Sequence, residues 1–230
     1  MRELASRLFY DSVRRLLVPV LYGFWSPRVS GLENIPREGA VIIAANHLAN
    51  ADSAVLPILT PRRIHFLVKS TYWHDGGLSN LVQRLFFTAA GAIPVDRGTL
   101  HSAQGSLEVA LKYLRRGEAF GIYPEGTRSR DGRLYKGRGG AAWLAFEADA
   151  PIIPVGLRGT QHFWPSGSKH PLRHPFTIRF GEPIFPSEVA PGKPKSVRRR
   201  ELTETLMRRI AELSGQEYVD RLNTPAPQTK

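Results

Sequence analysis

The chain is organised around residues 40–52, which read AVIIAANHLANAD. The apolar run 40–45 is too short for most helices and rich in β-branched residues, so it predicts a buried strand. His47 then lies where this strand ends and a loop or helix begins. Functional side chains of α/β domains commonly occupy that position.

His47 is followed by an aspartate, Asp52, at a spacing that allows the two side chains to meet. If the segment after His47 turns into a helix, the carboxylate remains within reach of the imidazole. A carboxylate on one ring nitrogen fixes the tautomer and frees the other nitrogen to take a proton. The pair is therefore a candidate general base. The alternative is a hydrogen-bonded histidine at a strand end, with Asp52 as the cap of the following helix.

The rest of the chain offers no protein nucleophile for such a base. It contains no cysteine and no Gly-x-Ser-x-Gly elbow, which disfavours cysteine and serine hydrolases. No His-Glu-x-x-His motif or clustered His and Asp set supplies three metal ligands, so we expect no metal site. A base without a protein nucleophile indicates that the nucleophile belongs to the substrate, and an acceptor hydroxyl is the natural candidate.

Two arginines, Arg97 and Arg128, each follow a turn-forming block at the end of an expected strand. The planar guanidinium suits phosphate oxygens, and the backbone amides around Gly126 and Thr127 would add donors. A carboxylate beside a phosphate would repel it, so we expect Glu125 to orient Arg128 or another donor, or to bond a substrate hydroxyl. The alternative for either arginine is a solvated surface charge.

Four blocks of sequence occur in a fixed order: residues 46–52, Gly91–Arg97, Tyr123–Ser129 and Ile152–Val155. In this order and at these separations they resemble the glycerolipid acyltransferase family, in particular the 1-acyl-glycerol-3-phosphate (lysophosphatidate) acyltransferases of phospholipid synthesis. The resemblance covers the chain from about residue 29 to residue 181. Tyr123 stands where phenylalanine is common in the family, a departure that we do not expect to matter.

The resemblance implies a reaction and a role for each block. His47 would deprotonate the free hydroxyl of a lysophosphatidate-type acceptor while Asp52 holds the imidazole. The alkoxide would attack the acyl thioester of coenzyme A or acyl carrier protein, giving phosphatidate with no further cofactor. The phosphate and glycerol of the acceptor would be bound by Lys69, Arg97, Glu125, Gly126, Thr127 and Arg128, with Lys136 as a further candidate.

Two smaller expectations belong to the same resemblance. Asn46 would hydrogen-bond near the oxyanion, and Ile152–Val155 would shape the side that receives the acyl donor. Two alternatives to the proposed reaction stay open. The acceptor would be another lysophospholipid or a glycolipid, or the protein would be a lipid-binding module without catalytic activity.

Composition limits the partners. The 230 residues carry a formal net charge of +12 and a sequence pI near 10.4, which indicates an anionic partner. No RNA-binding or zinc-finger signature is present, so we expect no specific nucleic acid. No stretch of eighteen apolar residues occurs, and the N-terminus lacks the features of a secretion signal. An anionic membrane surface is the partner that fits.

Residues 1–25 combine leucines at three- and four-residue steps with arginines, which predicts a basic amphipathic helix, bent or broken near Pro19. This helix would pack on the domain core, lie in the bilayer interface, or do both. We therefore expect a peripheral, monotopic protein at the cytoplasmic face of the cell membrane.

Strand and helix patterns alternate along the rest of the chain, which predicts one α/β domain with a central mixed sheet flanked by helices. We divide the chain into an N-terminal membrane-associating segment (1–27), an acyltransferase domain (28–215) and a C-terminal tail (216–230). Strands are expected over residues 29–36, 40–45, 63–69, 93–95, 119–123, 151–157 and 176–180, and helices over residues 78–90, 102–116, 141–148 and 196–214.

Overall fold

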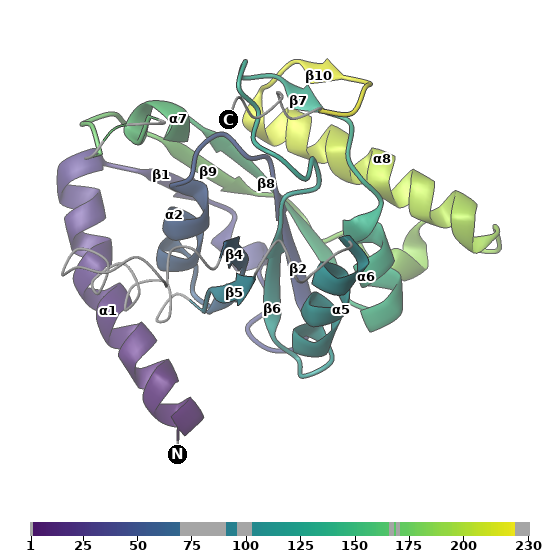
Figure 1. The fold of residues 1–230 in the computed structure, drawn as a ribbon, viewed down its shortest axis with the longest axis horizontal. Coiled ribbons are helices and arrows are strands. Elements are labelled where there is room, and N and C mark those ends of the chain that lie inside the picture. The colour runs from purple at the N-terminus through teal and green to yellow at the C-terminus, as the bar shows by residue number, and fades with distance from the viewer. Residues whose placement is uncertain (1, 70–90, 96–102, 166–167, 169–170, 224–230) are drawn as a thin grey trace.

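The computed structural model describes residues 2–69, 91–95, 103–165, 168 and 171–223. The helix expected over residues 78–90 lies outside this part of the chain. In the described part, helices cover both faces of a central sheet (Figure 1).

Among the described residues, six strands form the main sheet in the order β1-β9-β8-β2-β6-β3. Neighbouring strands are parallel except β8 and β9, which are antiparallel, so the predicted mixed sheet is confirmed. The predicted strand 40–45 lies in the middle as β2, and all of its residues are buried. The strands are β1 Arg28–Ser30, β2 Val41–Ala45, β3 Ile64–His65, β6 Ala119–Ile122, β8 Ile152–Arg158 and β9 Thr177–Phe180.

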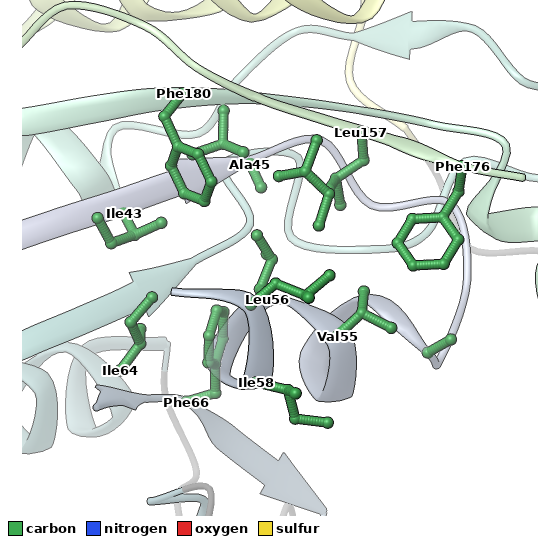
Figure 2. Packing of buried hydrophobic residues seen from close by; sticks show 14 of the residues in the cluster. Ile43, Ala45, Val55, Leu56, Ile58, Ile64, Phe66, Leu157, Phe176 and Phe180 are labelled. Carbon is green, nitrogen blue, oxygen red and sulfur yellow. The ribbon is translucent and has the colours of Figure 1, made fainter. Parts of the chain in front are cut away.

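Apolar side chains of β2 face both ways, because successive residues of a strand point to opposite faces of a sheet. Ile43 and Ala45 join a core with α1 and α2, whereas Ile42 and Ala44 join a second core with α5, α6 and α8. Figure 2 shows part of the first core, with Leu56 of α2 below the sheet. The helices are α1 Arg2–Trp25, α2 Asp52–Leu59, α5 Ala103–Leu114, α6 Gly140–Ala148, α7 Thr160–Phe163 and α8 Lys195–Ser214, with short 3₁₀ helices at Leu32–Asn34 and Pro186–Glu188.

The segment 63–69, predicted as one strand, is divided between two sheets. Its first part is β3 in the main sheet, and its second part is β4 (Leu67–Lys69), which pairs with β5 (Ile93–Val95). Phe66 stands between them and is buried. Its ring occupies the space over Gly121 of β6, where a β carbon would overlap it. The chain changes neighbours at Phe66 because this residue packs across β6 and does not continue along it.

The N-terminal helix is continuous, so the break considered near Pro19 does not occur. Side chains on both sides of the proline are anchored on the domain. The Tyr10 hydroxyl donates to the Pro57 carbonyl at 2.6 Å, and Trp25 Nε1 donates to the Leu172 carbonyl at 2.9 Å. These contacts stabilise the helix and offset the loss of the backbone hydrogen bond that a proline cannot make.

The C-terminal segment, expected as a tail from residue 216, contains a strand. β10 (Tyr218–Val219) pairs in parallel with β7 (Leu134–Tyr135). Two-residue strands carry no usable period, so the sequence pattern could not indicate this pairing.

Candidate active site

The carboxylate of Asp52 holds both the imidazole of His47 and the loop that follows it. Asp52 is the first residue of α2 and is fully buried. Its Oδ2 atom lies 2.8 Å from His47 Nδ1 and accepts the backbone N–H groups of Leu48 at 2.7 Å and Ala49 at 2.8 Å. The predicted imidazole contact is present, whereas Ala51 and not Asp52 is the N-cap residue of α2. With Nδ1 directed at the carboxylate, Nε2 is the nitrogen that can take a proton.

The imidazole also rests on an aromatic ring. Tyr123 follows β6 and stacks on His47, with ring centroids 3.8 Å apart and planes 8° apart. The Tyr123 hydroxyl and Ser53 Oγ lie 3.0 Å apart. Burial raises the pKa of Tyr123 well above its usual value, so the phenol stays neutral. Sequence reasoning gave this tyrosine no role, although the pairing of Ala44 with Ile122 brings the ends of β2 and β6 together.

Glu125 connects two backbone segments. It is fully buried, and its Oε1 and Oε2 atoms accept the N–H groups of His47 at 3.4 Å and Tyr135 at 3.0 Å. Of the roles expected for Glu125, the structure shows contacts with other donors, the backbone N–H groups of His47 and Tyr135. Desolvation raises the pKa of Glu125 to about 7, although both N–H donors act in the opposite direction.

Gly126, Thr127 and Arg128 form a loop beside His47. Gly126 has a positive φ of 74°, and a β carbon there would lie 2.9 Å from Arg138 Nε, so glycine suits the position. The loop then reaches Ser129, whose N–H donates to the His47 carbonyl at 2.8 Å. The structure therefore brings the third predicted block against the first.

The remaining predicted residues are placed differently. Lys69 ends β4, and Arg97 lies outside the described residues. Lys136 forms an ion pair with Asp220, with 2.9 Å between Nζ and Oδ1. The fourth block lies in β8, next to β2.

Asn46 does not act as expected. Its side chain is fully buried and bonds the backbone of Leu157, donating to the carbonyl at 2.9 Å and accepting the N–H at 2.7 Å. Its amide group also donates to Gln216 Oε1 at 2.7 Å. The amide therefore ties β2 to β8 and to the C-terminal segment, and is not presented to an oxyanion.

A histidine held by a buried carboxylate at the carboxyl end of a largely parallel sheet is an arrangement for general-base chemistry in an α/β enzyme. A family model described as Acyltransferase matches residues 26–158. The chain therefore belongs to the acyltransferase family, and the resemblance seen in the four blocks is confirmed.

Individual relatives agree with this assignment. A Bacillus subtilis protein named 1-acyl-sn-glycerol-3-phosphate acyltransferase is 28% identical over 190 residues, covering 82% of this chain and 88% of its own length. A Borreliella burgdorferi protein of the same name is 32% identical over 136 residues, covering 59% of this chain and 52% of its own.

A solved structure extends the comparison to the fold. The Thermotoga maritima protein PlsC, described as a 1-acyl-sn-glycerophosphate (LPA) acyltransferase, matches with a TM-score of 0.70 at 22% identity, over 93% of this chain and 83% of its own. At this identity the match supports the α/β fold alone.

Proposed function

We propose that this acyltransferase moves a fatty acyl group from an acyl thioester to the free hydroxyl of 1-acyl-glycerol-3-phosphate, giving phosphatidate for phospholipid synthesis. The observation that carries the proposal is the His47–Asp52 pair, set beside the loop of Arg128 in a chain of this family. The names of the relatives support the choice of acceptor.

The chemistry requires one proton to move twice. His47 Nε2 takes the proton of the acceptor hydroxyl as its oxygen attacks the thioester carbonyl, and Asp52 stabilises the imidazolium that forms. The tetrahedral intermediate expels the thiolate, which takes the proton from the imidazolium. An ester and a free thiol result, and the protein is unchanged.

Arg128 and the backbone amide of Thr127 are the described groups that we assign to the acceptor's phosphate, since the Gly126 N–H donates to the Tyr123 carbonyl at 2.9 Å. The guanidinium lies on the loop that is hydrogen-bonded to the His47 carbonyl through Ser129. Binding the phosphate there would bring the acceptor hydroxyl towards the imidazole. Coenzyme A and acyl carrier protein are both proposed as donor carriers, and neither requires a further cofactor.

The test is acyl transfer from labelled palmitoyl-coenzyme A and palmitoyl-acyl carrier protein to lysophosphatidate, other lysophospholipids and a glycolipid. We expect labelled phosphatidate from lysophosphatidate and at least tenfold less product from the other acceptors. Preferred transfer to another acceptor would retain the mechanism and change the substrate. Lipid binding without transfer from either donor would favour the non-catalytic module.

We also propose that α1 attaches the protein to an anionic membrane surface, at the cytoplasmic face of the cell membrane. Across the described residues, none of the helices has the length and hydrophobicity that crossing a bilayer requires. One side of α1 packs on the core through Tyr10 and Leu21. Another side exposes large apolar groups, with Leu16 at 71% and Phe24 at 63% exposure. Such a helix fits the interface, where apolar groups enter the acyl region and arginines meet anionic headgroups.

The attachment predicts that Leu16→Ser and Phe24→Ser together weaken binding to phosphatidylglycerol-containing vesicles at least tenfold, because two large side chains would no longer leave water, at about 1.5–3 kcal/mol each. Vesicle flotation measures the effect. Phe185→Ser, at an exposed apolar residue outside α1, is the matched control and is expected to bind as the wild type does. Equal vesicle binding by the wild type, the double variant and Phe185→Ser would mean that Leu16 and Phe24 do not form the membrane contact.

A further inference from the structure

The segment after α8 returns to the end of the sheet where the candidate base lies. Gly215, with a φ of 70°, ends α8 by donating its N–H to the Ala211 carbonyl at 2.7 Å. The chain then pairs with the segment that follows the Glu125–Arg128 loop, because Leu134 N–H donates to the Glu217 carbonyl at 2.9 Å and β10 joins β7. Figure 1 shows this strand pair beside the C-terminal end of α8.

Gln216 uses both ends of its side-chain amide to join two parts of the site. Its Oε1 atom accepts from Asn46 Nδ2 at 2.7 Å, and its Nε2 atom donates to the Gly132 carbonyl at 2.7 Å. Asn46 directly precedes His47 and is itself fixed to the backbone of Leu157. Gln216 therefore links Asn46, the neighbour of the candidate general base, to the loop that continues from Arg128.

Asn223 provides a second attachment further along the same segment. Its Nδ2 atom donates to the Arg128 carbonyl at 3.2 Å. This bond acts on the backbone of the residue whose guanidinium we assign to the phosphate. Between Arg128 and β7, Asp131 accepts from Ser129 Oγ at 3.2 Å and forms an ion pair with Arg133 at 2.7 Å, so side chains of the loop also restrict it. The bonds from Gln216 and Asn223 join this loop to the C-terminal segment.

We propose that Gln216 and Asn223 are positioning residues for acyl transfer: Gln216 sets the peptide that carries His47, and Asn223 sets the backbone of Arg128. This inference rests on the proposed function, in which His47 is the general base and Arg128 binds the phosphate. Both positions lie beyond residues 26–158, the part matched by the family model. The hydrogen bonds act on geometry alone, and a displacement of about 1 Å at a reacting group can lower a rate by about 10²-fold.

The test of Gln216 is Gln216→Met, which keeps the length of the side chain and removes both hydrogen bonds. We expect kcat to fall about tenfold with an unchanged KM for the acyl donor, at a temperature at which the variant is folded by circular dichroism. Glu217→Gln is the matched control, because the recorded contact of Glu217 uses its backbone carbonyl. It is expected to keep the wild-type kcat.

Asn223→Ala separates the second role. We expect its KM for lysophosphatidate to rise about fivefold with kcat unchanged, because the bond acts on Arg128 and not on His47. A folded Gln216→Met protein with kcat within twofold of the wild type, or an unchanged acceptor KM in Asn223→Ala, would overturn the corresponding assignment.

A readout that does not depend on turnover separates this inference from the proposed function. Nitrogen-15 NMR of the His47 imidazole is expected to show shifted ring signals in Gln216→Met and wild-type signals in Glu217→Gln. If the wild type transfers no acyl group to lysophosphatidate but the ring signals shift, the proposed function fails and the positioning of His47 stands. Unshifted signals in Gln216→Met would refute the positioning.

Discussion

Replacing His47 with alanine is expected to lower kcat for acyl transfer about 10³-fold, within the range of about 10²–10⁴ that general-base catalysis supplies. The side chain is 15% exposed, so its removal leaves a small space at the site and not a cavity in the core. The expected KM values stay within about threefold, because phosphate and acyl binding are assigned to other groups. Steady-state transfer of label from palmitoyl-coenzyme A measures the change.

Asp52→Asn tests the same base without removing it. An asparagine keeps the shape, and its oxygen at the Oδ2 position can still accept from His47 Nδ1, Leu48 and Ala49, but the negative charge beside the imidazole is lost. Without that charge the imidazolium formed during the reaction is no longer stabilised. We expect kcat to fall at least 10²-fold. If folded His47→Ala keeps a tenth or more of the activity, the base lies elsewhere in the chain.

Glu125→Gln is expected to change how stability depends on pH. The folded protein holds the Glu125 proton up to a pKa of about 7, whereas the unfolded chain releases it near 4.5. Between these values the folded state binds more protons, so this carboxyl makes the wild type less stable as pH rises. The difference of about 2.5 pKa units corresponds to about 3 kcal/mol, present below pH 4.5 and lost by about pH 7.

Urea unfolding of both proteins from pH 4 to pH 8 measures this contribution. The stability of Glu125→Gln relative to the wild type is expected to rise by about 3 kcal/mol over that interval, since an amide has no proton to lose. Glu33→Gln, at an exposed carboxylate, is the control and is expected to follow the wild-type curve. Parallel curves for Glu125→Gln and the wild type would mean that the carboxyl is solvated when it ionises.

The sequence predicted the places of His47 and Asp52 because both depend on local pattern. A buried strand must end before a polar run, and the carboxylate of Asp52, five residues after His47, is close enough to reach the imidazole and the loop between them. Arg128 follows the neighbouring strand β6 in the same way, so parallel pairing brings it to the same edge.

Partners of buried polar groups could not be predicted in this way. Asn46 bonds Leu157, 111 residues away, and Glu125 bonds the backbone of Tyr135 across a loop. A buried amide or carboxylate must find partners, but its residue type does not say which. The division of residues 63–69 has a similar cause, since the packing of Phe66 over Gly121 depends on which strands are neighbours.

The contact between Gln216 and Asn46 spans 170 residues, and this has a consequence for the time at which the protein becomes active. During synthesis, His47 and Asp52 leave the ribosome together and can meet at once. Gln216, which joins Asn46 to the Gly132 carbonyl, is added only after all strands of the main sheet have been made. A nascent chain would therefore carry the His47–Asp52 pair before Gln216 can bond Asn46, and full activity would arrive only with the segment that follows α8.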